Sequence, residues 1–373
     1  MTKSNALIEQ NKTQSKKQLD LVSALKKAAA LSGSKPMRIM ADWWKLKKKV
    51  GALSFEEYIE YRLYDPSYTQ EAKEDFVSEK LHWQMTGKAC DLSWRAATED
   101  KWLSYEILAK LGHPTPQTIA VADQTSRQYG PTRKLATLEE FVEFATSLSE
   151  FPVFAKPNRE VGSFGAYLIE GLSGNDLVIA GGEKVSMAEA YDSVFSKTEY
   201  LFQKFIHNHS DILKYSKYLA TVRTLNIIKD GELKTPFTLL KIPSSKSIAD
   251  NYWREGNLLA NIDPKSGEIL RVVSGKGLSV KEHEQHPETG HQLVGEHLPH
   301  WSKLLELNEA CALTFSPVRY QSMDIAITEA GPVVIEINTG GSFMLPQLAS
   351  GTGFLTPDVR DFFESCGYTF GKK

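Results

Sequence analysis

The sequence lacks the features that mark disulfide-stabilised, zinc-binding and membrane-spanning proteins. Its 373 residues include three cysteines, Cys90, Cys311 and Cys366, which lie far apart without a CxxC spacing. Neither a disulfide framework nor a thiolate zinc site is therefore expected, and we predict buried thiols. No run of eighteen apolar residues is present, and the first residues lack the apolar segment of a signal peptide. We therefore expect a cytoplasmic protein without a membrane span.

The chain has little net charge, but that charge is unevenly distributed. The formal net charge is -2, whereas residues 1–50 hold twelve Lys or Arg against three acids, a net of +9 that leaves about -11 for the rest. A basic segment on an acidic body indicates either contact with an anionic surface or a solubilising tail. Because the body is acidic and has no motif that combines aromatic and basic residues, nucleic acid is not an expected partner.

The length exceeds what one hydrophobic core usually serves, so two or three compact units are expected. The N-terminal part is mostly helical in pattern. The segment LDLVSALKKAAALSG has apolar residues at helical spacing and ends in Gly33. Ser54 and Glu57 have the spacing of a capping box at the start of a helix. We predict a basic helical arm over residues 1–50 and a helical region over residues 51–95.

Strands and helices are mixed in the remainder of the chain. Strands are predicted at TIAVA, FPVFAKP, GAYLIEG, EYLFQKFI, ATVRTLNIIKDGELKTPFTLLKI and SMDIAITEAGPVVIEIN, and helices at LATLEEFVEFATSLSE and LPHWSKLLELNEACALTF. Tight turns are expected at Asp230-Gly231 and Gly331-Pro332. Since the order is not a regular βαβ alternation, we predict an α+β fold with antiparallel sheets.

The stretch FAKPNREVGSFG combines a lysine with a glycine-containing loop. Lys156 ends an apolar strand, and Ser163 follows between Gly162 and Gly165. Such a loop lets backbone N–H groups approach phosphates closely. Neither a GxxxxGK[ST] loop nor a GxGxxG fingerprint occurs in the chain. Without further context the pattern is also typical of a structural hairpin.

The second chemical pattern is MDIAITEAGPVVIEIN, which reads as a β-hairpin. Asp324 lies on one strand, and Glu336 and Asn338 share a face of the next strand at a spacing of two. These oxygen ligands suit Mg²⁺ held together with substrate phosphates. A sheet with a polar face is the alternative, but acids within otherwise apolar strands are costly without a cation. We therefore favour a metal site.

The histidine-rich run KEHEQHPETGHQLVGEHLPH raises the question of a zinc site. Its histidine spacings do not match a helical HExxH, and Pro287, Gly290 and Gly295 break any regular face. We therefore predict a surface loop.

The motifs together resemble those of the ATP-grasp superfamily. KPNREVGSFG is similar to the loop of D-alanyl-D-alanine ligases, and IEINTGG is similar to their closing motif. EEYIEYRLYD, DKWLSYEILAKLGHPTP, ADNYWREGN, HPETG and PHWSKLLELNEACALTFSPVRYQSMDIAI resemble the sugar-transfer-associated branch, over roughly residues 50 to 365. The resemblance implies an ATP-grasp fold in which a small lobe, residues 96–202, and a large lobe, residues 203–373, clamp ATP.

The resemblance also implies roles for individual residues. Contacts to the ATP phosphates are implied for Lys101, Lys156, Gly162, Ser163 and Gly165, and contacts to adenine for Gln203, Lys204 and Ile206. Asp211 is expected at the ribose and Arg223 at the terminal phosphate, and Asp324, Glu336 and Asn338 are expected to hold two Mg²⁺ ions.

The chain departs from the ligases at one position. They carry an arginine two residues before the first metal aspartate, where this chain has Ser322. Arg254 or Arg319 is the expected substitute for this intermediate-stabilising cation. Asn251, Arg254 and Asn257 form a polar loop expected to face the acceptor.

The activity implied by the resemblance is an ADP-forming carboxylate–amine ligase. It would activate a small carboxylate as an acyl phosphate for attack by an amine, with a sugar- or polysaccharide-related partner. Two alternatives remain open: a kinase on the same fold that phosphorylates a hydroxyl, and a non-catalytic nucleotide-binding protein. A homo-oligomer is compatible with the sequence.

Overall fold

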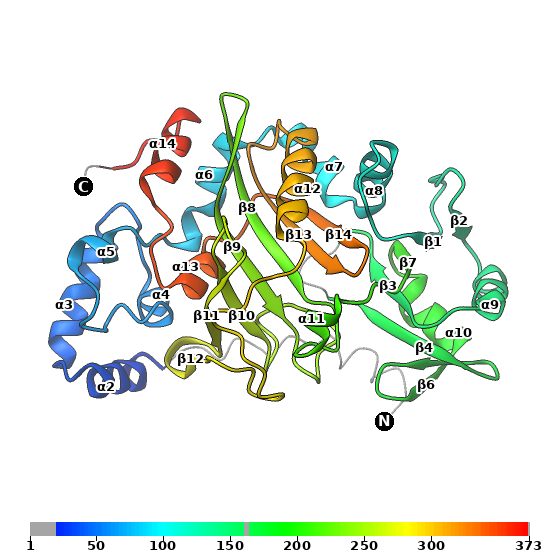
Figure 1. Ribbon diagram of the computed structural model, residues 1–373, viewed down its shortest axis with the longest axis horizontal. Helices are drawn as coiled ribbons and strands as arrows, with labels where there is room; N and C mark the ends of the chain where they lie inside the picture. Colours follow the sequence, from blue (N-terminus) through cyan, green and yellow to red (C-terminus); the bar gives the residue numbers. More distant parts are fainter. Residues whose placement is uncertain (1–19, 160–163, 372–373) are drawn as a thin grey trace.

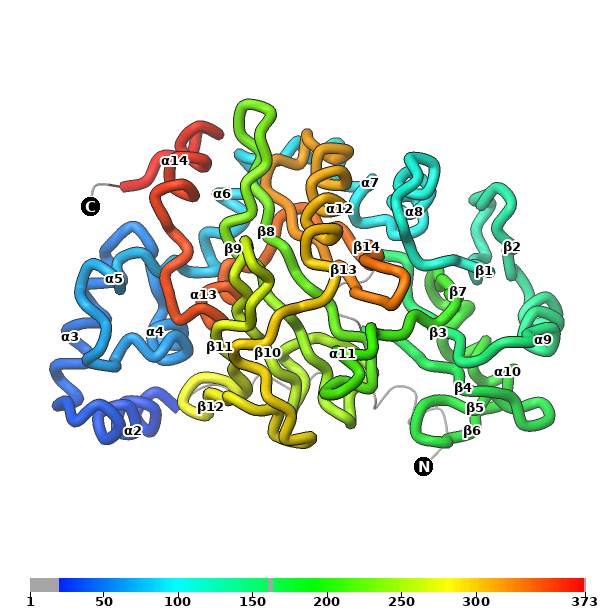
Figure 2. The backbone as a smooth tube through the Cα atoms, viewed as in Figure 1, coloured from blue at the N-terminus to red at the C-terminus, as the bar shows by residue number. Residues whose placement is uncertain are grey.

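The protein is built on two seven-stranded sheets, seen in the computed structural model, which describes residues 20–159 and 164–371 (Figure 1). The chain passes from the first sheet to the second once, after β7, as the tube in Figure 2 shows. Apart from one parallel pair, β1 with β2, all strand pairs are antiparallel. The predicted α+β class is confirmed. Within the described residues no helix is long and apolar enough to cross a bilayer.

The first sheet has the strand order β2-β1-β7-β3-β4-β5-β6. Its strands are β1 (Thr118–Ala122), β2 (Arg133–Leu135), β3 (Val153–Pro157), β4 (Tyr167–Ser173), β5 (Asp176–Ile179), β6 (Glu183–Ser186) and β7 (Tyr200–Lys204). Three helical segments, α9 (Leu138–Ser147), α10 (Met187–Ala190) and the π-helical η3 (Tyr191–Phe195), pack on one face. Because side chains alternate along a strand, that face takes Val153 and Ala155, and the opposite face takes Phe154 and Lys156.

The second sheet has the strand order β12-β11-β10-β9-β8-β13-β14. Its strands are β8 (Thr221–Lys229), β9 (Glu232–Ile242), β10 (Leu258–Ile262), β11 (Ile269–Ser274), β12 (Lys281–Glu282), β13 (Tyr320–Thr328) and β14 (Gly331–Thr339). The helices α11 (Ser210–Leu213) and α12 (Trp301–Thr314) cover one face. That face buries Val222, Leu240 and Ile325 against α12.

The other face of the second sheet shares a core with an N-terminal helical region. Its helices are α2 (Leu21–Ser32), α3 (Pro36–Lys47), α4 (Phe55–Glu60), α5 (Gln70–Glu74) and α6 (His82–Ala89), with the short 3-10 helices η1 (Glu79–Leu81) and η2 (Leu92–Trp94). The next helices, α7 (Arg95–Glu99) and α8 (Lys101–Lys110), lie against β14, and a later 3-10 helix, η4 (Gly277–Ser279), contacts α2 and α4. The C-terminal helices α13 (Met344–Ser350) and α14 (Pro357–Ser365) join the same core. Ala28 and Ile39 of α2 and α3 are buried in it. The predicted arm is therefore packed onto the body from residue 20 onward, and its first 19 residues lie outside the described part.

Several local predictions match the structure in detail. Helix α2 ends at Gly33, which has φ 65°, and Ser54 forms the predicted capping box with Glu57. Asp230 and Gly231 turn between β8 and β9 with φ 54° and 83°. The turn predicted at Gly331-Pro332 lies two residues earlier, at Glu329 and Ala330, because Gly331 already pairs with Thr328. The three cysteines are free, as expected, and Cys90 and Cys311 are buried.

The lobe boundary predicted between residues 202 and 203 lies inside strand β7. The proposed division of the chain into an arm, a helical region and two lobes stays a prediction.

One face of the second sheet is divided between core and cavity. Leu225 and Tyr320 lie under the N-terminal helices and α13, whereas Arg223 and Asp324, further along the same strands, face the first sheet. The register pairs Asp324 with Arg223 on one side and with Glu336 on the other. The polar end of this face of the second sheet therefore lies opposite the first sheet.

Candidate active site

A cavity of about 560 Å³ lies between the two sheets. The first sheet contributes Phe154, Lys156, Leu168 and Gln203, and the second contributes Thr221, Arg223, Lys241, Asp324, Glu336 and Asn338. The N-terminal helices supply a third wall, which includes His82, Trp83 and Arg95. Of the thirteen predicted site residues that the structure describes, nine line this one cavity: Lys101, Lys156, Gln203, Lys204, Ile206, Arg223, Asp324, Glu336 and Asn338.

Asp324 is the centre of the charged end of the cavity. The Arg223 guanidinium donates from Nε and Nη2 to the two carboxylate oxygens of Asp324 at 2.8 and 2.7 Å. Lys241 Nζ lies 3.0 Å from the same carboxylate and 3.0 Å from Asp250. Burial alone would raise the pKa of Asp324, but these two cations hold it well below its usual range. Asp324 is therefore ionised, as a metal ligand must be.

Glu336 and Asn338 lie on β14, next to Asp324 on the paired strand β13, and the three side chains form an oxygen-rich cluster. Lys101, at the start of α8, places Nζ 3.0 Å from Glu336 Oε1. The Asn338 side-chain nitrogen is buried and has no hydrogen-bond partner among the described residues. Two carboxylates and the amide oxygen of Asn338 are a set of oxygen ligands that fits Mg²⁺. In this structure the lysine and arginine side chains pair with the carboxylates that Mg²⁺ would bind.

Lys156 faces the cavity from β3 in an almost fully buried position. Its Nζ donates to the Tyr105 hydroxyl at 2.7 Å, and Tyr105 in turn donates to the carbonyl of Ile335. Burial lowers the pKa of Lys156 to about 8, against the opposing attraction of Glu336, Asp250 and Asp324. This lysine therefore carries a poorly compensated charge that an anionic ligand would satisfy.

The far end of the cavity is more apolar and lies at the end of β7. Gln203, Lys204 and Ile206 line it, together with Phe154 and Leu168. The Lys204 ammonium points outward to Glu150 at 3.1 Å, so its backbone and not its charge faces the cavity. Gly165 has φ 74°, and a Cβ there would lie 2.7 Å from the Tyr200 hydroxyl. Gly162 and Ser163 lie outside the described residues.

Four predicted residues do not line the cavity: Gly165, whose neighbours Phe164 and Ala166 do, and Asp211, Arg254 and Arg319. Asp211 is exposed on α11 and pairs with Lys214 at 2.6 Å, because the short helix turns it toward solvent. Arg319 lies just before β13, where it donates to the carbonyl of Ile228 at 3.0 Å and packs over the Phe362 ring of α14. Arg254 also does not line the cavity, although its neighbours Asn251 to Trp253 do. The predictions of ribose and intermediate contacts for these residues therefore lack geometric support.

Asn257, predicted to face the acceptor, has an internal structural role. It is buried, and its side chain joins Ser244, Ala249 and Asn251 through hydrogen bonds of 2.8 to 2.9 Å. The loop that includes Asn251 is thereby fixed at the cavity wall.

Sequence reasoning missed Lys241 and Asp250. Lys241 interrupts the apolar run LLKI of β9 just as Lys156 interrupts FAKP, so the same signal was present. Asp250 lies in a loop and gave no periodic signal. The wall built by α6 and α7 was also missed, because its contact with the sheets spans more than two hundred residues of sequence. There, His82 Nε2 donates to the carbonyl of Gly341 at 3.1 Å, and the Arg95 guanidinium lies over the Trp83 ring.

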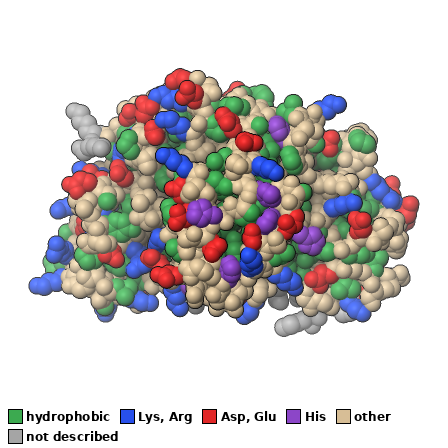
Figure 3. Space-filling view, viewed as in Figure 1, with side chains coloured by type: hydrophobic (Ala, Val, Ile, Leu, Met, Phe, Trp, Pro, Cys, Tyr) green, Lys and Arg blue, Asp and Glu red, His purple; other side chains and the backbone are tan. Residues whose placement is uncertain are grey.

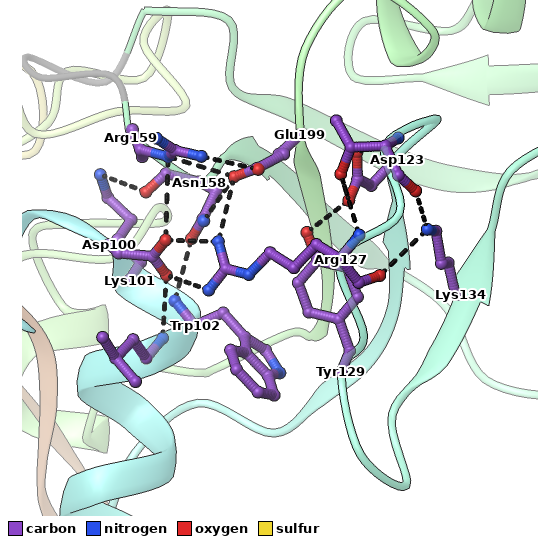
Figure 4. A network of polar contacts seen from close by, with 12 residues as sticks. Asp100, Lys101, Trp102, Asp123, Arg127, Tyr129, Lys134, Asn158, Arg159 and Glu199 are labelled. Atoms are coloured by element: carbon purple, nitrogen blue, oxygen red, sulfur yellow. Dashed lines mark hydrogen bonds and ion pairs between the residues drawn. The ribbon is translucent and has the colours of Figure 1, made fainter. Parts of the chain in front are cut away.

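A polar network joins the start of α8 to the two chain segments that flank β3 and β7 (Figure 4). Arg127 donates from both terminal nitrogens to Asp100, the N-cap of α8, at 2.5 and 3.1 Å. Glu199 accepts from Arg127, from Asn158 at 2.9 Å and from Arg159 at 2.7 Å. Burial alone would raise the pKa of Asp100, but the hydrogen bonds from Arg127 hold it below its usual value.

The same network holds Lys101 in place, together with Asn158 and Arg159, the residues just before the glycine loop. The Asn158 side chain accepts from the Trp102 backbone at 2.9 Å, and its carbonyl accepts from the Lys101 backbone at 3.3 Å. Since Asn158 and Arg159 directly precede the loop, the network fixes where the loop leaves β3 and where α8 presents Lys101.

The histidine-rich run forms a surface loop, as predicted. In Figure 3 most of the visible histidine side chains lie in the central part of the face, separated by other side chains. In the described parts of the chain, no group of three His, Cys, Asp or Glu side chains is arranged to hold a metal ion.

The family described as "Sugar-transfer associated ATP-grasp" matches residues 84–361. No curated protein matches the chain.

Solved structures similar to the chain include VanG D-Ala:D-Ser ligase from Enterococcus faecalis, with 15% identity, a TM-score of 0.45 and coverage of 75% of this chain and 64% of that one. D-alanine–D-alanine ligase from Helicobacter pylori matches with 14% identity, a TM-score of 0.39 and coverage of 72% and 60%. Biotin carboxylase from Campylobacter jejuni matches with 13% identity, a TM-score of 0.41 and coverage of 74% and 48%. The chain thus spans about half to two thirds of the length of these structures.

Proposed function

Because the chain belongs to the sugar-transfer associated ATP-grasp family, we propose that it is an ATP- and Mg²⁺-dependent ligase that joins a carboxylate to an amine. One observation carries the proposal. Four buried or half-buried cations, from α8 and from strands of both sheets, converge on two adjacent carboxylates in one cavity: Lys101, Lys156, Arg223 and Lys241 around Asp324 and Glu336. Such a cluster suits a ligand that brings both phosphates and a divalent cation.

In our proposal each part of ATP binds to a different part of the cavity. The apolar end lined by Phe154, Leu168 and Ile206 suits adenine, and the four cations suit the triphosphate. Asp324, Glu336 and Asn338 would hold Mg²⁺, two ions in our proposal. Bound Mg²⁺ would neutralise charge on the transferring phosphoryl group.

The proposed reaction has two steps. A substrate carboxylate oxygen attacks the γ-phosphorus and ADP leaves, which gives an acyl phosphate. An amine that has lost a proton then attacks the acyl carbon, and inorganic phosphate leaves with the bonding electron pair. Arg223 and Lys241 would stabilise the charge that develops in both steps, because they lie on the cavity side of the sheet next to Asp324.

Lys241 is our candidate for the cation that replaces the ligases' arginine, since this chain has Ser322 at that position. Ser322 is buried, and its hydroxyl donates to the carbonyl of Gly340 at 3.1 Å, so it supports the chain after Asn338 and carries no charge. The cation expected at Arg254 or Arg319 is instead provided, in our proposal, by Lys241.

The end of the cavity near α6 and α7 would receive the acid and the amine. Trp83 and Trp253 offer flat aromatic faces, and Arg95 offers a cation. Aromatic faces pack well against sugar rings, which supports a sugar-related substrate. The neutral imidazole of His82, whose pKa is lowered by burial, adds a group able to accept a proton there.

Hydroxylamine trapping tests the proposal. Purified protein is incubated with ATP, Mg²⁺, hydroxylamine and pools of amino acids, sugar acids and small carboxylates, and hydroxamate and ADP are measured. We expect both products from one pool, because hydroxylamine intercepts an acyl phosphate. Glu336→Gln should lose both products, whereas Glu306→Gln, an exposed change on α12, should retain them. ADP without hydroxamate would contradict the ligase and favour phosphoryl transfer to a hydroxyl.

A further inference from the structure

Helix α3 has two apolar faces, of which only one is packed against the protein. Ile39 and Leu46 point into the core shared with the second sheet. On the opposite face Met37, Met40 and Trp44 are 85%, 37% and 50% exposed. At a helical period of 3.6 residues these three side chains form one continuous stripe. Leu31, near the end of α2 and just before the short turn into α3, is also exposed.

The exposed stripe is surrounded by positive charge. Its cations are Lys35, Arg38, Lys45, Lys47 and Lys48, all exposed. Among the described residues, no carboxylate pairs with any of these five side chains. The one acid of the helix, Asp42, lies toward the core side and is bound by Lys73 at 2.6 Å and by the Tyr58 hydroxyl at 2.9 Å. In Figure 3, Lys and Arg side chains mark the left edge of the molecule, where Figure 1 places α3.

Trp44 combines both properties of this surface. The ammonium groups of Lys47 and Lys48 lie 5.1 and 5.2 Å from its ring centre. A tryptophan ring among lysines, with its apolar face open, is the arrangement that amphipathic side chains adopt at the boundary between lipid headgroups and acyl chains. The lysines would remain at the headgroup level while the ring and the two methionines enter the acyl boundary.

Three kinds of partner differ in how well they fit both the charges and the apolar stripe of this surface. A second copy of the chain would place like charges opposite each other around the stripe, which disfavours self-association. A nucleic acid would use the cations but leave Trp44 and the methionines without a role. A bilayer with anionic lipids satisfies the charges and the apolar stripe together.

We propose that the α2–α3 surface, defined as Leu31, Met37, Met40 and Trp44 with the five surrounding cations, docks the protein on an anionic lipid bilayer. The surface lies at the end of the molecule away from the first sheet (Figure 1), and none of its residues lines the cavity. Docking through this surface therefore does not block the candidate active site, and the inference is independent of the reaction proposed above.

Vesicle sedimentation tests the docking surface. Full-length protein is mixed with phosphatidylcholine vesicles that contain about one third phosphatidylglycerol, or none, since the anionic lipid supplies the surface potential. We expect partitioning to the anionic vesicles, at least about tenfold weaker partitioning without the anionic lipid, and loss in high salt. Equal partitioning to both vesicle types would overturn the proposal.

Two triple variants separate the contributions. Lys45, Lys47 and Lys48 changed to Gln should weaken partitioning about a hundredfold, since each charge near the surface accounts for about fivefold. Met37, Met40 and Trp44 changed to Ser should weaken it by a similar or larger factor. The matched controls, Lys110, Lys265 and Lys303 changed to Gln and Leu270 and Leu313 changed to Ser, should partition like wild type.

Each remaining outcome is informative. Because both triple variants retain residues 1–19, wild-type partitioning in either variant would assign binding to that segment and overturn the proposal. Wild-type protein that ignores vesicles but binds polyglutamate or DNA through the three lysines would also overturn it, in favour of another polyanion. An unchanged thermal stability of the variants would confirm that the folded state is compared.

Discussion

At the residue scale, Lys156 is the side chain whose charge state most directly controls the proposed site. Its pKa of about 8 makes it a cation below that pH and neutral above it. Since an anionic phosphate needs the cation, we expect the affinity for MgATP to fall as the pH rises through about 8. Isothermal titration calorimetry across this range measures the effect. An affinity that is flat through that range would contradict a phosphate contact by Lys156.

The same residue should limit stability in the absence of ligand. A lysine whose pKa in the folded protein lies below its unfolded value of 10.5 destabilises the folded state while it is charged. This loss of folding free energy is fully present below pH 8 and disappears as the pH rises toward 10.5. Lys156→Met should therefore raise the free energy of unfolding near pH 7 by up to about 3 kcal/mol, less whatever the lost bond to Tyr105 costs. Urea unfolding measures this, and MgATP binding should be lost.

Lys184→Met serves as the matched control for Lys156→Met. Lys184 is exposed on β6 of the same sheet and does not line the cavity, so neither stability nor MgATP affinity should change appreciably. A loss of stability in Lys156→Met would show that its bond to Tyr105 outweighs the cost of burying the charge.

At the element scale, the network of Arg127 positions the start of α8 and the root of the glycine loop. Arg127→Ala should remove the bidentate bond to Asp100 and the link to Glu199. We expect the KM for ATP to rise about tenfold with little change in kcat, because the change weakens ground-state positioning and spares the reacting groups. The free energy of unfolding should fall by about 2 kcal/mol, since Asp100 is left buried without its partner.

Two further variants separate positioning by Arg127 from general destabilisation. Arg127→Lys keeps the charge but not the fork geometry and should restore stability more than it restores the KM. Arg133→Ala, on neighbouring β2, removes an exposed pair with Glu143 and should leave both values near wild type. A KM that follows stability in every variant would show that Arg127 has only a structural role.

At the scale of the whole molecule, the two halves of the site hold each other in the absence of ligand. Lys101 lies at the start of α8, and its backbone N–H donates to the carbonyl of Asn158, which follows β3 of the first sheet. Its ammonium pairs with Glu336 of the second sheet. Mg²⁺ alone would have to displace this lysine, whereas MgATP supplies a cation for Glu336 and phosphates for Lys101. Binding of Mg²⁺ and of the nucleotide should therefore be strongly coupled.

This coupling can be measured by titration calorimetry and by the shift in melting temperature. We expect a larger shift from MgATP than from Mg²⁺ and ATP added separately and summed. Lys101→Met should bind Mg²⁺ alone about tenfold more tightly, because Glu336 is released, and MgATP more weakly. Lys110→Met, at the other end of α8, is the matched control and should behave as wild type. Weaker binding of Mg²⁺ by Lys101→Met would contradict the proposed competition.

The sequence by itself determined the local elements and the chemical character of the site. The hairpin pattern of MDIAITEAGPVVIEIN placed Asp324 on a strand paired with that of Glu336, and the spacing of two placed Glu336 and Asn338 on one face. The lysine that ends the apolar strand FAKP indicated a cation for an anionic ligand, Lys156. Because strand alternation and turn chemistry are local properties, they are readable without a structure. The family resemblance, confirmed by the match over residues 84–361, rests on the same motifs.

Only the tertiary structure decided which charges meet. It brought Lys241 and Arg223 to Asp324, kept Asp211 and Arg319 away from the cavity, and packed α2 and α3 into the core shared with the second sheet. These outcomes depend on contacts between residues that are distant in the chain, and the energies of such contacts leave no periodic signal in the sequence. The pairing of cations with the proposed metal ligands is the clearest case, because the sequence shows each charge but not its neighbour.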